Sequence, residues 1–262
     1  MNMPEDADPN ALFPAGAALV IGGSGGLGDA ICRMLAAQGS DVALTYHGNK
    51  AAADTVAQAV VDAGRRATAY RMPLDDADAV KAIVDDVAEQ FGAIHTLVFT
   101  VGPDIGQPFV SEVTPEQWRE VMVVEPVGYF NTVHAALPHL RASRGSVVAV
   151  TSAATMRYAP RDILSAAPKA SVNLLTSAIA REEGRNGVRA NVVAPGFISG
   201  GLGQRLLDTV VSEREHEAIL RASALRRIGT AEELAEVVVF LASSKASLVT
   251  GQIIAADGGY TA

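Results

Sequence analysis

The stretch Val20-Ile21-Gly22-Gly23-Ser24-Gly25-Gly26-Leu27-Gly28 decides the fold. It follows a short apolar run (residues 17–21) that is typical of a β-strand, and it opens an amphipathic stretch (28–38) that is typical of a helix. Glycines at such a junction allow a tight turn and let backbone N–H groups approach a pyrophosphate at the positive end of a helix. A purely structural turn would also use glycine, but the position between strand and helix favours phosphate binding.

Strands and helices alternate from this loop to the end of the chain. Strands are expected at 17–21, 41–46, 67–72, 96–100, 146–151, 189–194 and 253–256. Helices are expected at 28–38, 51–63, 78–91, 115–140, 163–183 and 231–242. Apolar strands that alternate with helices form a parallel sheet covered on both faces. Without a linker or composition break, we expect one domain over 14–262: a three-layer α/β Rossmann fold with a doubly wound parallel sheet, whose ligands bind at the carboxyl ends of the strands.

Composition narrows the classes of function. The 21 basic and 29 acidic residues give a net charge of -8, which argues against nucleic acid or an anionic membrane as the main partner. Cys32 is the only cysteine, and the five histidines lack paired spacing, so we expect no disulfide framework and no metal. Residues 1–13 are predicted to be a flexible tail and not a signal peptide. No apolar run reaches the ~20 residues of a membrane span, so we expect a soluble, cytoplasmic protein.

Several motifs in a fixed order resemble the short-chain dehydrogenase/reductase family. The glycine spacing of Gly22, Gly26 and Gly28 is followed by Pro195-Gly196 after a strand and by Asp257-Gly258-Gly259 after the last strand. Ser152 matches the family's active-site serine and Lys169 its lysine. The resemblance covers nearly the whole chain. It implies a nicotinamide-dependent oxidoreductase with a small-molecule substrate, assembled as a homotetramer or dimer through the helices at 115–140 and 163–183.

The resemblance also assigns the cofactor contacts. They fall on Gly22, Ser24, Gly25, Gly26, Leu27, Gly28, Tyr46, His47, Asn49, Leu74, Thr100, Gly102, Lys169, Pro195, Gly196 and Ile198. NAD enzymes place an acid after the second strand to bind the ribose hydroxyls. Here the chain has Tyr46-His47-Gly48-Asn49-Lys50, which favours NADP(H) over NAD(H), although a solvated loop would have the same composition.

Four positions depart from the family pattern. Ser165 stands four residues before Lys169, where the family has its proton-transferring tyrosine, and Glu125 stands where an asparagine completes the catalytic set. Phe99-Thr100-Val101-Gly102 replaces the usual Asn-Asn-Ala-Gly, and Pro73 replaces an aspartate that contacts adenine. Pro126 and Pro168 adjoin the altered positions, and a proline inside a helix is expected to kink it at a cost of about 3 kcal/mol. This grouping predicts a remodelled active site.

Three side chains are candidates to replace the tyrosine. Tyr158 lies on the loop before the Lys169 helix, either turned into the cleft or half-buried in the loop. Glu125 is either an acid or base with a raised pKa, an exposed carboxylate, or the ion-pair partner of Lys169. Asp162 is either an acid or only the cap of the Lys169 helix. Ser165 itself is a poor proton donor, because a serine hydroxyl is a far weaker acid than a phenol.

Three classes of function remain open. The first is an NADP(H)-dependent oxidoreductase acting on a carbonyl or conjugated alkene of a small apolar substrate, with Ser152 polarising the substrate oxygen and Lys169 holding the ribose. The second is a non-redox catalyst with Glu125 as base, and the third is a catalytically silent nucleotide-binding subunit. The segment 197–222 is expected to form a mobile lid over the substrate, with Gly200, Gly201 and Gly203 near its start.

Overall fold

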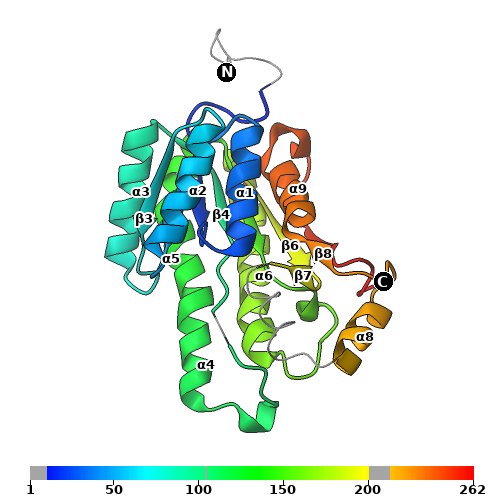
Figure 1. Ribbon diagram of the computed structural model, residues 1–262. Helices are drawn as coiled ribbons and strands as arrows, with labels where there is room; N and C mark the ends of the chain where they lie inside the picture. The colour runs from blue at the N-terminus through cyan, green and yellow to red at the C-terminus, as the bar shows by residue number, and fades with distance from the viewer. Residues whose placement is uncertain (1–10, 104, 201–212) are drawn as a thin grey trace.

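The computed structural model describes residues 11–103, 105–200 and 213–262 (Figure 1). Its strands are β1 Ala17–Ile21, β2 Asp41–Tyr46, β3 Ala67–Arg71, β4 Ile94–Phe99, β5 Ser146–Val150, β6 Arg189–Pro195, β7 Ile198–Ser199, β8 Gly229–Thr230 and β9 Ile253–Ala256. Its α-helices are α1 Gly26–Ala37, α2 Lys50–Asp62, α3 Ala77–Phe91, α4 Pro115–Met122, α5 Gly128–Ser143, α6 Ile163–Glu183, α8 Glu213–Ala222 and α9 Ala231–Ala242. Short 3-10 turns occupy Val110–Glu112, Ala153–Thr155, Gly184–Asn186 and Ser244–Ala246.

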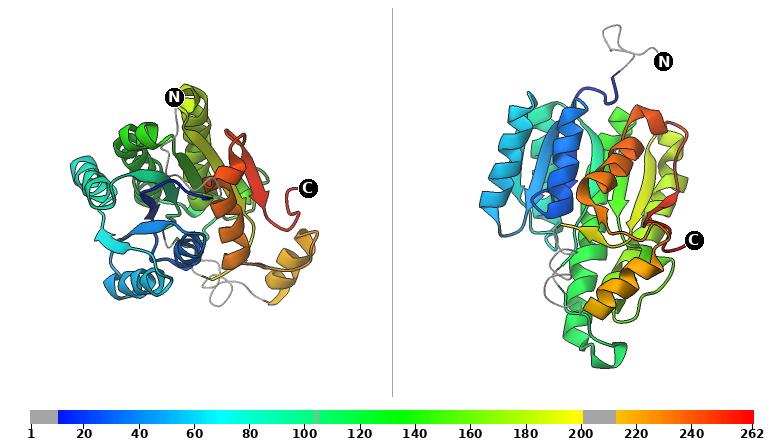
Figure 2. Two further views of the ribbon diagram at one scale, coloured as in Figure 1. Left: turned by 90° about the horizontal axis from the view of Figure 1, so that it is seen from above. Right: turned by 45° about the vertical axis from the view of Figure 1, so that its right-hand side comes forward.

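A parallel seven-stranded sheet forms the centre of the molecule, in the order β3-β2-β1-β4-β5-β6-β9. Successive side chains of a strand point to opposite faces, so each strand feeds two cores. Leu19 of β1 belongs to the core beneath α3, α5 and α6, whereas its neighbour Val20 belongs to the core beneath α1, α2 and α9. Figure 2 shows these helices on the two faces of the sheet. The predicted doubly wound, three-layer Rossmann fold is confirmed, and the strand order reverses between β1 and β4.

The expected strands are all present: β1, β2 and β9 have the expected boundaries, and those of β3, β4, β5 and β6 differ by one or two residues. The largest difference is at β4, which starts at Ile94 and ends at Phe99, two residues and one residue before the expected limits. Helical backbone runs without a gap over the predicted 115–140 helix, from Pro115 to Ser143, but it is not one regular α-helix. A π-helical turn, Val123–Val127, separates α4 from α5. Pro126 lies inside this turn and has no N–H to donate, so the regular hydrogen-bond ladder cannot pass through it. In contrast, α6 extends on both sides of Pro168.

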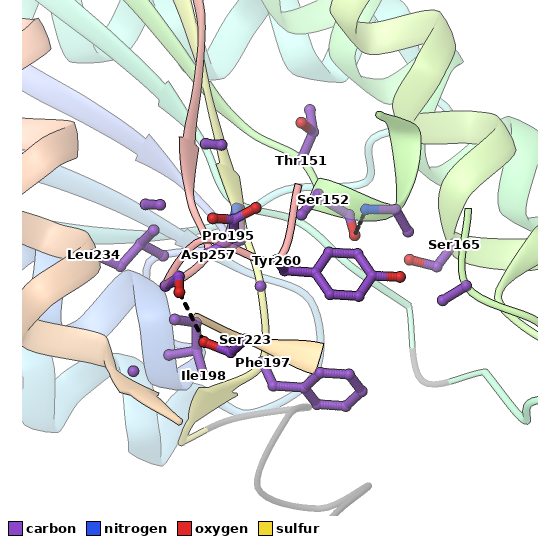
Figure 3. Close-up of a pocket in the computed structure, with 18 of the residues that line it drawn as sticks. Thr151, Ser152, Ser165, Pro195, Phe197, Ile198, Ser223, Leu234, Asp257 and Tyr260 are labelled. Atoms are coloured by element: carbon purple, nitrogen blue, oxygen red, sulfur yellow. Dashed lines mark hydrogen bonds between the residues drawn. The ribbon is translucent and has the colours of Figure 1, made fainter. Parts of the chain in front are cut away.

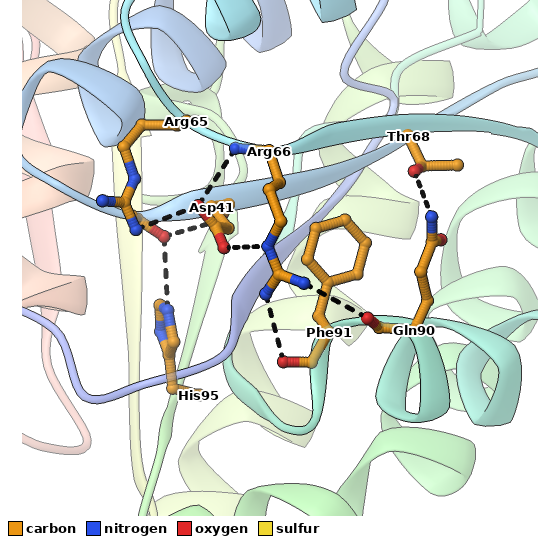
Figure 4. A network of polar contacts seen from close by, with 8 residues as sticks. Asp41, Arg65, Arg66, Thr68, Gln90, Phe91 and His95 are labelled. Atoms are coloured by element: carbon orange, nitrogen blue, oxygen red, sulfur yellow. Dashed lines mark hydrogen bonds and ion pairs between the residues drawn. The ribbon is translucent and has the colours of Figure 1, made fainter.

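A polar network joins the amino end of β2 to the turn before β3 and to the end of α3 (Figure 4). The Asp41 carboxylate accepts hydrogen bonds from the backbone N–H and the Nε of Arg66, at 3.1 and 2.7 Å, and pairs with Arg65 at 2.9 Å. Nearby, His95 is buried between Ser40 and Thr96. Phe13, which the sequence placed in the N-terminal tail, is also buried and stacks on His95 with ring centroids 5.3 Å apart. Residues 1–10 of that tail lie outside the described residues.

No helix within the described ranges is long and apolar enough to cross a membrane.

Candidate active site

A cavity of about 1110 Å³ lies at the carboxyl ends of the strands, where the strand order reverses. The β1–α1 loop, the segments that follow β4, β5, β6 and β9, the start of α6 and one face of α8 line it. Figure 3 shows Ser152, Ser165, Phe197 and Tyr260 facing one another across this space. Segments that are far apart in the sequence therefore meet at one cleft.

The glycine loop is shaped by close backbone contacts. A Cβ on Gly28 would lie 2.3 Å from the Gly22 carbonyl oxygen, and one on Gly23 would lie 2.6 Å from Cβ of Leu44. Gly22 has φ +82°, and its N–H donates to Oγ1 of Thr45 at 3.1 Å. Gly25 is the N-cap of α1 and has no side chain to occupy the space in front of the first helical turn. A dinucleotide pyrophosphate fits this arrangement, because open N–H groups at a helix N-terminus bind anions.

Most of the predicted cofactor contacts lie around the cavity. Its lining includes Gly25, Gly26, Leu27, Gly28, Thr100, Gly102, Lys169, Pro195, Gly196 and Ile198. Gly22 and Ser24 belong to the turn directly before Gly25 and are not part of the lining. Tyr46, His47, Asn49 and Leu74 are not part of the lining. Asn49 caps α2 by accepting from the Ala52 N–H at 3.0 Å, which gives this side chain a structural role.

One cation near the end of β2 was not identified from the sequence. Arg71 ends β3 directly beside Tyr46, and its Nε donates to the carbonyl oxygen of His47 at 3.3 Å. Lys50, which the sequence analysis associated with a 2′-phosphate, instead pairs with Asp54 at 2.7 Å on the exposed face of α2. Strand pairing brings Arg71 to this loop from 24 residues away. Arg71 therefore joins His47 as a candidate for the ribose end of the site.

Ser152 directly follows Thr151 at the end of β5 and lines the cavity. Its backbone is extended, and its Oγ accepts a hydrogen bond from the Ala154 N–H at 3.1 Å. This contact uses an acceptor lone pair of the hydroxyl, so the hydroxyl hydrogen is left for a partner in the cavity. The Ser152 hydroxyl can therefore donate a hydrogen bond into the cavity.

Lys169 and Glu125 form a buried pair. The Lys169 Nζ lies 2.7 and 2.9 Å from the two Glu125 carboxylate oxygens. The Glu125 side chain is only 1% exposed and that of Lys169 is 11% exposed. Burial raises the pKa of Glu125, and the charge and hydrogen bond of Lys169 offset part of that rise. Of the three alternatives for Glu125, the structure supports the ion pair. Glu125 sits in the π-helical turn and is not in the cavity lining, whereas Lys169 is.

Ser165 lies about one helical turn before Lys169 and Asp162 about two turns before it, and both line the cavity. Burial raises the Asp162 pKa to about 6, while the Lys169 charge and the Ser165 side chain lower it in part. Asp162 is the N-cap residue of α6, but its side chain makes no capping hydrogen bond. Its backbone carbonyl instead accepts from the N–H groups of Ser165 and Ala166. The expectation that Asp162 only caps this helix is therefore wrong for its carboxylate.

The two tyrosines near the cleft have opposite placements. Tyr158 is 48% exposed and is not in the cavity lining, so the structure supports its role as a loop residue. Tyr260 does line the cavity, and Figure 3 shows its ring between Ser152 and Ser165. Tyr260 was not predicted from the sequence, because it lies far along the chain from Lys169 and its motif. The detectable signal was its place directly after Asp257-Gly258-Gly259, one of the motifs that carry the family resemblance.

The predicted lid is described in part. Residues 201–212, including Gly201 and Gly203, lie outside the described residues. Gly200 has φ +103°, and Ala218, Ile219 and Ala222 of α8 line the cavity.

Comparison with known proteins agrees with this geometry. A family model described as enoyl-(acyl carrier protein) reductase matches residues 22–261. A 3-oxoacyl-[acyl-carrier-protein] reductase of Staphylococcus aureus is 34% identical over 243 residues, or 92% of this chain and 96% of that protein. A cis-4-hydroxycyclohexanecarboxylate dehydrogenase of Sinomonas cyclohexanicum is 34% identical, covering 95% and 98% of the two chains. The crystal structure of a short-chain dehydrogenase from Burkholderia cenocepacia in complex with NADP is 30% identical, with a TM-score of 0.88 over 97% of this chain and 100% of that chain. These similarities extend from the glycine loop to the C-terminal turn that carries Tyr260, and the chain therefore belongs to the short-chain dehydrogenase/reductase family.

Proposed function

We propose that the protein is an NADP(H)-dependent oxidoreductase that reduces a carbonyl group or a conjugated alkene of a small apolar substrate. The observation that carries the proposal is the convergence of the glycine loop, Ser152 and Lys169 on one cavity. The apolar side chains of Val101, Phe197, Ile198 and Ile219 in its lining favour an apolar substrate. A nicotinamide cofactor, when bound, supplies the hydride.

The residues around the cavity bind the cofactor and polarise the substrate. The open amides of the first turn of α1 hold the pyrophosphate, and Arg71 and His47 favour a 2′-phosphate on the ribose. Ser152 donates a hydrogen bond to the substrate oxygen, which stabilises the negative charge that develops there. Lys169 orients the nicotinamide ribose, as the family resemblance implies. The Lys169–Glu125 pair has no net charge, so this lysine is held in place without adding a positive charge to the cavity.

The pairing of Glu125 bears on the alternative, non-redox class of function. A general base needs a free lone pair within reach of the substrate proton. Both Glu125 oxygens contact Lys169, and the side chain is buried and is not part of the cavity lining. This arrangement favours hydride transfer over a reaction in which Glu125 abstracts a proton.

NADPH oxidation with a panel of ketones and enones tests the proposal. We expect turnover by the native protein and a loss of about 100-fold in kcat for Ser152→Ala, the usual effect of removing one donor to a developing oxyanion. Ser177→Ala is the matched control, because Ser177 lies within α6 and bonds the Asn173 carbonyl. Tight NADPH binding without turnover of any panel compound would refute the proposal. Substrate conversion without a change in nicotinamide absorbance would support the non-redox class.

We also propose that the protein assembles through α4, α5 and α6. These helices carry exposed apolar side chains, with Trp118 at 40%, Phe130 at 53% and Leu174 at 75% exposure. Exposed apolar residues on neighbouring helices favour a contact between copies of the chain. Light scattering tests this interface, because we expect the assembly formed by Leu174→Glu to have a lower mass than that of the native protein. An unchanged mass would contradict this interface.

A further inference from the structure

We infer that Tyr260, from the C-terminal end of the chain, supplies the phenolic hydroxyl that contacts and protonates the substrate oxygen. This inference rests on the proposed reductase function. The sequence has five tyrosines, and the other four have different environments. Tyr129 is buried and bonds Thr176 at 2.7 Å, Tyr70 bonds Gln90 at the sheet edge, and Tyr46 and Tyr158 lie outside the cavity lining. Tyr260 alone among them lines the cavity.

The position of Tyr260 is fixed by the turn that precedes it. The Asp257 carboxylate accepts hydrogen bonds from the Gly259 N–H, the Thr261 N–H and the Thr261 hydroxyl, at 2.8, 2.9 and 2.7 Å. The Gly258 carbonyl accepts from the Ser223 hydroxyl and from the Leu225 N–H, both at 2.9 Å. The C-terminal turn is therefore tied to the segment after α8, and it presents the next residue to the cleft from the side opposite to α6.

Arg157 holds the ring in the cleft. Its guanidinium lies 4.8 Å from the centre of the Tyr260 ring, and its Nη1 donates to the Tyr260 carbonyl oxygen at 2.6 Å. The Tyr260 hydroxyl donates to the Arg157 carbonyl oxygen at 3.3 Å, a long hydrogen bond that a substrate oxygen can replace. Figure 3 shows the hydroxyl pointing toward the side of the cavity where Ser165 lies. The phenol thus faces the helix position at which the family resemblance predicts one.

The proton step balances with groups already named. The substrate oxygen gains negative charge as hydride reaches the substrate, and the Tyr260 O–H bond breaks as a new O–H bond forms on that oxygen. The phenolate left behind regains its proton from water at the mouth of the cleft. During the transfer, the positive charge of Arg157 above the ring stabilises the negative charge on the phenol oxygen.

Tyr260→Phe tests the inference, because it removes the hydroxyl and keeps the ring and its contact with Arg157. We expect kcat to fall at least 100-fold, as for removal of a general acid, while the Kd for NADPH and the Tm stay unchanged. Tyr158→Phe is the matched control and should stay within twofold of native activity. Native kcat in Tyr260→Phe would overturn the inference. A loss of turnover only in Tyr158→Phe would overturn it as well.

A second measurement does not depend on turnover. Tetranitromethane nitrates accessible tyrosines, and mass spectrometry reports each site separately. Saturating NADP⁺ should slow nitration of Tyr260 several-fold and leave Tyr158 unaffected. Equal nitration of Tyr260 with and without NADP⁺ would overturn the inference. If the native protein oxidises no NADPH with the panel, the proposed function fails, and the nitration result still decides whether Tyr260 faces the ligand site.

Discussion

The buried ion pair of Lys169 and Glu125 allows a quantitative prediction of how substitutions change the free energy of unfolding. Removing one member leaves a buried charge without a partner, which costs about 3–5 kcal/mol. Replacing both members with apolar side chains of similar length removes both charges, and the result is often close to neutral. We therefore expect Glu125→Met and Lys169→Met each to lose about 3–5 kcal/mol of unfolding free energy. The double variant should lie within about 2 kcal/mol of the native protein, far from the sum of the single losses.

Urea unfolding followed by circular dichroism, at constant protein concentration, measures this cycle. The exposed pair of Arg33 and Asp29 is the control, since its side chains are 48% and 37% exposed although its atoms lie only 2.6 Å apart. Its coupling should be about 0.5 kcal/mol or less and should shrink in high salt, whereas the buried coupling should not. Additive losses in the Glu125 and Lys169 variants would refute the reasoning that the two charges are retained as a unit.

Three further predictions follow from the site. Gly28→Ala should abolish NADP(H) binding and lower the Tm, because its Cβ would lie 2.3 Å from the Gly22 carbonyl oxygen. Gly25→Ala should keep the native Tm, because its Cβ would lie 3.4 Å from the same oxygen, and equal losses of Tm in the two variants would contradict this reasoning. The Asp162 pKa rises from 3.8 to about 6 on folding, so the ionised carboxylate lowers the free energy of unfolding increasingly as the pH rises between these values. Urea unfolding should show that Asp162→Asn gains up to about 3 kcal/mol of unfolding free energy at pH 8 and nothing at pH 3.5, and an equal gain at both pH values would exclude this cause. Arg71→Ala should raise the KM for NADPH about tenfold and leave that for NADH unchanged in steady-state assays, and an equal change in both would remove Arg71 from the 2′-phosphate site.

The fold could be predicted because its determinants are local. An apolar run, a glycine turn and an amphipathic helix follow one another in sequence, so β1 and α1 were recognisable without any knowledge of their neighbours. The break between α4 and α5 was not predicted as such. Pro126 indicated a kink, and the structure has a π-helical turn there, within which Glu125 pairs with Lys169 of α6.

The site was predictable only in part, for a related reason. The glycine loop, Ser152 and Lys169 carry recognisable spacing, and they meet at one cavity as expected. Tyr260 reaches the cavity, and Arg71 reaches the loop after β2, through contacts over a long sequence separation. Arg157 and Tyr260 are 103 residues apart, and His47 and Arg71 are joined by strand pairing. Its place after Asp257-Gly258-Gly259 could have indicated Tyr260, but no spacing rule within one motif predicts its contact with Arg157 or that of Arg71 with His47, since the sheet topology decides which loops become neighbours.

The serine at position 165 has a different meaning once these contacts are considered together. A family tyrosine at this position would have the Lys169 charge beside it, but here both oxygens of Glu125 engage that charge. A phenol placed on α6 would therefore lose the electrostatic help that makes it a good acid. Tyr260 comes from the opposite wall and has its own cation, Arg157, above the ring. If the proposed function holds, the Glu125 and Ser165 substitutions and the placement of Tyr260 are parts of one rearrangement, in which the acid moved from the helix to the C-terminal turn. Restoring the helix phenol alone, as Ser165→Tyr, should then fail to raise kcat unless Glu125→Asn accompanies it.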